Sequence, residues 1–103
     1  MVHERVVLIG EDHPSVAGHF PNQPIVPGVV LLGEVFEMLR LGLAAPIRVT
    51  QLSAVKFSSP LRPGEALTIR VEEDAIAHAV FSCHVQGRPV ASGSIEFTRA
   101  ERT

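Results

Sequence analysis

A proline-rich stretch that leads directly into a long helical pattern restricts the fold of this chain more than any other feature. Residues 13–28 contain four prolines in close succession, which excludes a regular helix or a central strand there. The prolines stop at Gly28, and apolar residues then recur at helical spacing until Gly42. The spacing predicts an ordered loop or a site, followed by one helix over residues 28–42.

The apolar residues of this helix occupy most of its circumference. They are Val29, Leu32, Val35, Phe36 and Leu39. We therefore expect a largely buried helix, enclosed by a sheet rather than lying on a surface. A narrow sector with Gly33, Glu37 and Arg40 is the exception.

Runs of alternating or β-branched residues predict the strands that surround this helix. The runs are residues 5–9, 48–58, 66–73, 77–85 and 89–98. Residues 60–64, PLRPG, predict a turn, and Gln86-Gly87-Arg88 is a hairpin signal. One strand, one helix and then four strands, without a repeat or a linker, indicate a single α+β domain over residues 1–103.

Composition limits the class of protein. The chain has 103 residues, 46% of them apolar and 19% charged, with a net charge of −2. These values are typical of a globular protein and give no footprint for nucleic acid. A chain of this size buries a modest core, so we expect a homodimer or a higher homo-oligomer.

Several negative expectations follow from individual residues. Charges at Glu34, Glu37 and Arg40 interrupt the longest apolar region, so no membrane span is expected. The first residues do not resemble a signal peptide, which indicates a cytoplasmic protein. The single cysteine, Cys83, is expected to be a small buried apolar residue. The histidines lack the spacing of a metal site, and no metal is expected.

Residues 19–28, HFPNQPIVPG, resemble the HFPGxPIxPG signature of the (3R)-hydroxyacyl-acyl-carrier-protein dehydratases of the hot-dog fold. Residues 55–65, VKFSSPLRPGE, and 87–92, GRPVAS, look like the strand-turn and last-hairpin segments of the same family. The resemblance covers nearly the whole chain. It implies a curved antiparallel sheet around one long helix, in a dimer with two active sites at the interface.

The resemblance also implies a reaction and its partners. It implies reversible dehydration of a 3-hydroxyacyl thioester to a trans-2-enoyl thioester, in fatty-acid or related acyl-chain biosynthesis. The substrate would be carried on the phosphopantetheine of an acyl carrier protein or on CoA. No cofactor is implied, because the thioester itself acidifies the alpha proton. Lys56 and Arg62 are candidates to lie near the phosphopantetheine arm or an acidic carrier protein.

Site residues follow from the same resemblance. His19 matches the catalytic histidine of the family, which would remove the alpha proton. The Gly28 amide matches the donor to the thioester carbonyl. An acid from the helix of the other subunit would protonate the leaving hydroxyl. Residues expected to line the substrate site are Phe20, Pro27, Gly28, Val29 and Gly33.

The chain departs from the family at this acid. The family places its Glu or Asp fourteen residues after the histidine, and Gly33 stands there. Glu37 lies within about 40° of the Gly33 direction on a helix, but about 6 Å further along it. Glu34 is adjacent in sequence but points away from that direction unless a π-bulge absorbs one residue.

Alternatives to catalysis remain open for each of these residues. His19 can be a loop histidine bonded to a backbone carbonyl, and Gly28 can simply permit the turn into the helix. Glu37 can be an exposed partner of Arg40, and Glu34 a carboxylate at a dimer interface. Two other functions also remain: a non-catalytic acyl-binding or partner subunit, which Gly33 favours, and a hot-dog thioesterase, which the HFP signature disfavours.

Overall fold

A computed structural model describes residues 2–9, 25–75 and 77–99 of the chain. Its elements are β1 (Val2–Leu8), α1 (Gly28–Leu43), β2 (Ile47–Phe57), β3 (Ala66–Ala75), β4 (His78–Val85) and β5 (Arg88–Arg99). The order of one strand, one helix and four strands confirms the sequence-based prediction. The helix begins at the predicted residue and ends one residue later than predicted, whereas β1 begins three residues earlier than expected.

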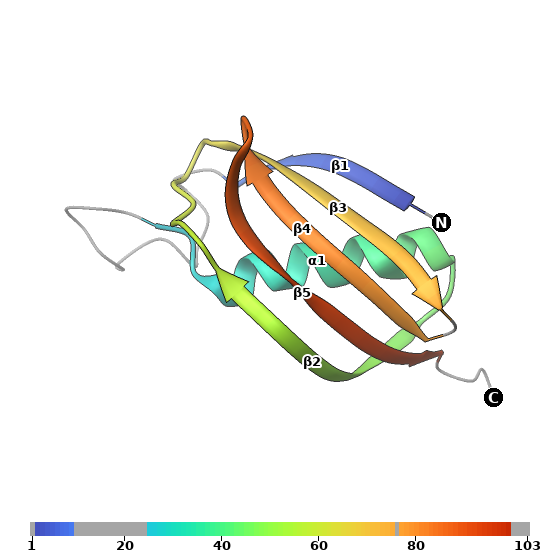
Figure 1. Cartoon of the computed structure of the whole chain (residues 1–103). Helices are drawn as coiled ribbons and strands as arrows, with labels where there is room; N and C mark the ends of the chain where they lie inside the picture. The colour runs from blue at the N-terminus through green and yellow to red at the C-terminus, as the bar shows by residue number, and fades with distance from the viewer. Residues whose placement is uncertain (1, 10–24, 76, 100–103) are drawn as a thin grey trace.

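The five strands form one sheet in the order β1-β3-β4-β5-β2, and every neighbouring pair is antiparallel. Figure 1 shows the sheet curving across α1, which lies along one of its faces. This is the hot-dog arrangement, in which strands that are distant in sequence close around a single helix. The strands β1 and β2 form the two edges of the sheet.

The core lies between the concave face of the sheet and one stripe of α1. In β4 half-buried and buried residues alternate along the strand, because successive side chains point to opposite faces of a sheet. Phe81 and Cys83 are among its inward residues, 3% and 1% exposed, so Cys83 is buried as predicted. Burial raises the pKa of the Cys83 thiol to about 12, which keeps it protonated and unreactive at neutral pH.

The helix is less buried than its sequence predicts. Its buried residues are Leu31, Val35, Met38 and Leu39. Val29 and Leu41 are 76% and 52% exposed, because the sheet of a single chain covers only one side of α1. The expectation of a largely buried helix is therefore wrong for one chain alone, whereas Gly33, Glu37 and Arg40 are exposed as expected.

Two connections of the sheet lie at the end where α1 begins. Figure 1 shows the β2–β3 loop, residues 58–65, and the β4–β5 hairpin at the same end of the sheet as the start of the helix. The hairpin turn is formed by Gln86 and Gly87, with φ of 47° and 81°. Two successive positive φ angles are typical of a tight hairpin turn, which confirms the hairpin predicted here.

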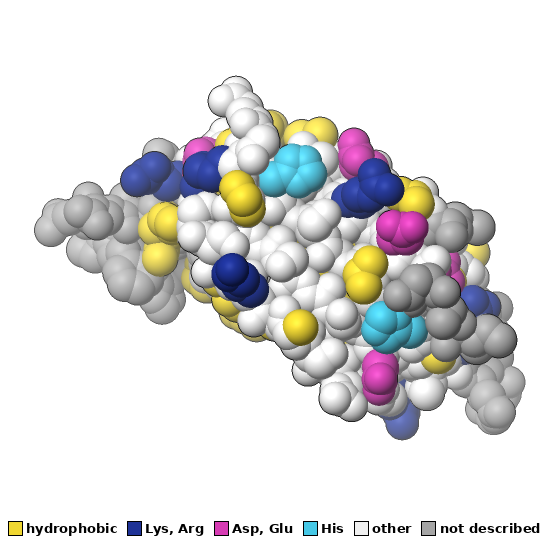
Figure 2. Space-filling view, viewed as in Figure 1, with side chains coloured by type: hydrophobic (Ala, Val, Ile, Leu, Met, Phe, Trp, Pro, Cys, Tyr) yellow, Lys and Arg dark blue, Asp and Glu magenta, His cyan; other side chains and the backbone are white. Residues whose placement is uncertain are grey.

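The outer face of the sheet carries charges of both signs and histidines that are scattered rather than clustered, as Figure 2 shows. Within the described residues, no helix has the length and apolar character needed to cross a membrane.

Candidate active site at the start of the helix

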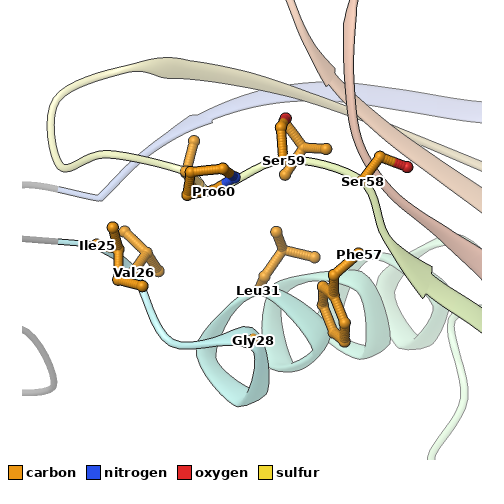
Figure 3. Close-up of a pocket in the computed structure, with 10 residues that line it drawn as sticks. Ile25, Val26, Gly28, Leu31, Phe57, Ser58, Ser59 and Pro60 are labelled. Atoms are coloured by element: carbon orange, nitrogen blue, oxygen red, sulfur yellow. The ribbon is translucent and has the colours of Figure 1, made fainter.

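A pocket of about 390 Å³ opens beside the N-terminus of α1. Its wall is mostly apolar, and it comes from the residues before the helix, the first helical turn, the end of β2, the β2–β3 loop and β5. The lining residues are Ile25, Val26, Gly28, Leu31, Phe57, Ser58, Ser59, Pro60, Leu61 and Val90. Figure 3 shows the side chains of Val26, Leu31, Phe57 and Pro60 around this space.

The first amides of α1 border this pocket. Pro27 stands at the N-cap, where it makes no side-chain hydrogen bond to the helix. Its carbonyl accepts from the amides of Val30 and Leu31, at 3.0 and 3.4 Å. The amide of Gly28 precedes these residues, where a helix offers it no acceptor of its own. An unpaired N–H at the positive end of the helix dipole is suited to a carbonyl oxygen or an oxyanion.

An aromatic ring approaches Gly28 closely. A Cβ atom at this position would lie 2.9 Å from Cζ of Phe57. Phe57 is itself 53% exposed, and its ring forms part of the pocket wall. The sequence identified Phe57 only as an apolar residue of a strand, because nothing in the local pattern predicts a contact between residues 29 positions apart.

The β2–β3 loop holds the chain on both sides of residues 10–24. The amide of Val26 donates to the carbonyl of Leu61 at 2.8 Å, and the amide of Gly64 donates to the carbonyl of Ile9 at 2.8 Å. Residues 10–24 contain His19 and Phe20, which lie outside the described residues. The described chain thus holds both flanks of that segment against the β2–β3 loop, and one of them, at Val26, lines the pocket.

Glu37, the first candidate for the missing acid, is paired with Arg40. Arg40 Nε donates to Glu37 Oε2 at 3.0 Å, and a second contact joins Arg40 Nη2 to Oε1. The hydrogen bond from Arg40 lowers the pKa of Glu37 below its ordinary value of 4.5. A carboxyl group with a lowered pKa is ionised at neutral pH and is poorly suited to donate a proton.

Glu34, the second candidate, lies on a different flank of the helix. Met38 and Leu41, one and two turns further along the same flank, face β1, where they line a small hollow with His3. Phe57 contacts Gly28 from the side of β2. Glu34 therefore lies on the β1 flank, as its helical position predicts, and is not among the residues that line the pocket.

Of the predicted substrate-binding residues, Gly28 lines the pocket and Pro27 is its half-buried neighbour. Val29 and Gly33 are exposed and lie outside the lining. A Cβ atom at Gly33 would meet nothing within 4 Å, so the position of the lost acid is open space in this chain. The described residues contain no group of three or more side chains arranged to hold a metal ion.

Comparisons with known proteins agree with this geometry. Residues 3–94 match the family model described as ApeI-like, ApeI dehydratase. A 3-hydroxyacyl-acyl-carrier-protein dehydratase FabZ from Roseiflexus sp. (strain RS-1) is 30% identical, over 93% of this chain and 73% of the relative. A FabZ from Chlamydia trachomatis serovar L2 is 28% identical, over 99% of this chain and 74% of the relative.

Solved structures share the fold. The dehydratase heterocomplex ApeI:P from Xenorhabdus doucetiae has a TM-score of 0.85 at 24% identity, over 95% of this chain and 88% of that one. The fluoroacetyl-CoA-specific thioesterase FlK has a TM-score of 0.74 at 15% identity, over 97% of this chain and 92% of that one. At these identities the likeness concerns the fold, and dehydratases and thioesterases both adopt it.

The sheet around one helix and the sequence relatives define the class as a dehydratase of the hot-dog fold. Within that class, the chain belongs to the ApeI-like dehydratase family.

Proposed function

We propose that this chain catalyses the reversible dehydration of a (3R)-3-hydroxyacyl thioester to the trans-2-enoyl thioester, in fatty-acid or related acyl-chain biosynthesis. The observation that carries the proposal is the apolar pocket beside the Gly28 amide, at the end of the HFPNQPIVPG motif. The pocket suits an acyl chain, and the amide suits the thioester carbonyl.

In this proposal His19 takes the proton from the alpha carbon, and the Gly28 amide stabilises the negative charge that develops on the carbonyl oxygen. The hydroxyl on the beta carbon leaves as water once an acid has protonated it. The electrons of the broken C–H bond form the new double bond, so no redox partner is needed. The thioester arrives on an acyl carrier protein or on CoA.

The weak step in this scheme is protonation of the leaving hydroxyl. Gly33 offers no carboxyl group, Glu37 is held ionised by Arg40, and Glu34 lies on the β1 flank. We propose that the chain on its own is a slow dehydratase, limited by its acid. Glu37 is the better placed of the two substitutes, because it shares the exposed sector of Gly33, but its pairing with Arg40 makes it a weak proton donor.

The same observations favour a second role, that of an acyl-binding partner subunit. The ApeI:P dehydratase is a heterocomplex, so a hot-dog dehydratase subunit with a similar fold assembles there with a different chain. A partner that places its own carboxyl group near Gly33 would supply what this chain lacks. In this role the pocket and the Gly28 amide remain, and the acid comes from the other subunit.

We further propose that the chain works as an oligomer. Its edge strand β2 pairs with β5 on one side only, and Leu52 and Phe57 are exposed there. Val29 is also exposed, on the first turn of the helix next to Gly28, which Phe57 contacts. A second subunit across this edge would cover apolar surface and bring a second helix towards the site.

Hydration of a short trans-2-enoyl thioester by the purified protein tests the proposal. Wild type is expected to turn over slowly, and His19→Ala is expected to abolish turnover because the base is gone. If Glu37→Gln loses the slow wild-type activity and Glu34→Gln keeps it, Glu37 is identified as the acid. Full activity in His19→Ala would overturn the proposed role of His19.

Binding separates the second role from the first. A partner subunit is expected to bind a carrier-linked acyl thioester without turning it over, until a chain that carries the acid is added. If the protein neither binds nor turns over CoA-linked and carrier-linked substrates of several chain lengths, both roles are contradicted.

A further inference from the structure

One arginine side chain fastens the β2–β3 loop to the last hairpin. Nη1 of Arg88 donates to Oγ of Ser59 at 3.0 Å and to the carbonyl of Pro60 at 2.8 Å. Nη2 of the same residue donates to Oε2 of Glu65 at 2.7 Å. The guanidinium group therefore contacts both ends of the loop, which begins after β2 and finishes before β3.

Glu65 extends this clamp to the middle of the loop. Its second oxygen, Oε1, accepts from the backbone amide of Arg62 at 2.7 Å, and its own amide donates to the carbonyl of Arg62 at 3.2 Å. The side chains of Arg88 and Glu65 are 35% and 26% exposed, so the pair is partly shielded from water. Partial shielding makes a charge-assisted pair stronger than a fully exposed one.

The loop that the clamp fixes forms part of the pocket. Ser59, Pro60 and Leu61 all line the pocket, and Figure 3 shows Pro60 across this space from the start of α1. The same loop supplies Leu61 O to Val26 and Gly64 N to Ile9, the two hydrogen bonds on either side of residues 10–24. Movement of this loop would therefore displace a pocket wall and both of these anchors together.

We infer that Arg88 and Glu65 are positioning residues for the pocket at the helix N-terminus. Neither side chain lines the pocket itself. They act through the β2–β3 loop, which the planar guanidinium group fixes by donating in several directions at once. The positioning role of the pair in the reaction rests on the proposed function, whereas the contacts that define the clamp do not.

Amide hydrogen exchange, measured residue by residue by NMR, tests the clamp without any need for activity. In Arg88→Met we expect the amides of Val26 and Gly64 to exchange at least about 10-fold faster, because local opening of the loop breaks their hydrogen bonds. The exchange rates of amides in the centre of β3, such as that of Ile69, should change less than about twofold. Unchanged protection at Val26 and Gly64, or an equal loss throughout the core, would overturn the inference.

Two further variants control this measurement. Arg88→Lys keeps the charge but lacks the planar fork, so it should also fail to protect both amides. Arg70→Met removes an arginine on the outer face of the sheet, where it pairs with Glu4 and Glu72 at 4.0 and 3.8 Å. It should leave exchange at Val26 and Gly64 unchanged, and a loss there equal to that in Arg88→Met would overturn the inference.

Steady-state kinetics then test the positioning role. In Arg88→Met we expect KM for a trans-2-enoyl thioester to rise about 10-fold, because the pocket wall loses its contacts with Arg88 and is held less firmly, although the bonds from Ser59 Oγ to Pro89 O and from Ser58 N to Val90 O remain. A merely structural role would reduce the amount of folded enzyme and lower kcat without changing KM. An unchanged KM would therefore overturn the positioning role. Inactive wild type would instead count against the proposed function, and the exchange experiment would still decide the clamp.

Discussion

Gly33 is the single residue on which the chemistry of this chain depends most. It stands where the family resemblance requires a carboxyl group, and the space around it is open. Glu37, which faces the same exposed sector, is paired with Arg40 and held ionised rather than free to act as an acid. The sequence alone predicted this sector and left the choice between Glu37 and Glu34 open. An ion pair between Glu37 and Arg40 was one of the alternatives that the sequence left open.

Glu65 gives the loop a dependence of stability on pH. Its pKa is lowered from the ordinary value of 4.5, first by the hydrogen bond from the Arg62 amide and then by Arg88. A carboxyl group with a lowered folded-state pKa stabilises the protein above its unfolded-state pKa, and this stabilisation is lost as pH falls through the folded-state value.

Substitution of Glu65 by Gln tests this dependence. We expect wild type to be more stable than Glu65→Gln at pH 7, and the difference to shrink as pH falls below about 4.5, where the unfolded-state carboxyl group protonates. Urea denaturation of both proteins across this range provides the measurement. A difference that stays constant from pH 7 to pH 3 would rule out the proposed contribution of the carboxylate.

The strands β4 and β5 pack closely at the point where an aromatic ring of one strand lies against a glycine of the other. A Cβ atom at Gly93 would lie 2.8 Å from Cε1 of Phe81 and 3.1 Å from Cγ2 of Val55. Phe81 is 3% exposed and pairs with Gly93 across the two strands. A buried ring has little freedom to move aside, so this position has no room for a methyl group.

Gly93→Ala is expected to destabilise the protein by about 1 to 3 kcal/mol through overpacking. Gly33→Ala is the matched control: its new methyl group meets open space, and the helix gains about 0.5 to 1 kcal/mol from the loss of a glycine. Chemical denaturation of both variants provides the comparison. Equal effects of the same sign would contradict the packing described for β4 and β5.

The elements themselves were largely predictable, and the contacts between distant residues were not. Periodicity gave the helix and the alternating strands, and Gln86-Gly87 gave the hairpin, because these signals are local. The ring of Phe57 on Gly28 and the fork of Arg88 on Ser59 and Glu65 join residues 23 to 29 positions apart. No local pattern encodes such contacts, and only the closing of the sheet around α1 creates them.

In a single chain the described residues leave the β2 edge of the sheet and the adjoining helix surface uncovered. The edge strand β2 spans eleven residues, of which eight are exposed and three are half-buried. The apolar residues Val29, Leu52 and Phe57 are exposed on or near this side. An edge of this length without a covering element is a site for pairing with another subunit.

Light scattering after size-exclusion chromatography tests this expectation. We expect a mass of at least two chains, and a shift towards one chain in Leu52→Lys, because a charge would replace apolar surface at the edge. Arg70→Met, on the outer face of the sheet, should keep the wild-type mass. A single-chain mass for wild type at high concentration, with no partner added, would contradict assembly of identical subunits and leave a heteromer as the form to test.

The most direct test of the proposed function restores the missing acid. Gly33→Glu and its neutral counterpart Gly33→Gln differ only in the carboxyl group, and position 33 has room for either side chain. Hydration of a carrier-linked trans-2-enoyl thioester should proceed at least about 10-fold faster in Gly33→Glu than in wild type, since a positioned acid contributes two or more orders of magnitude in favourable cases. Gly33→Gln should match wild type. Equal rates in all three proteins would contradict the claim that the absent acid at position 33 limits this dehydratase.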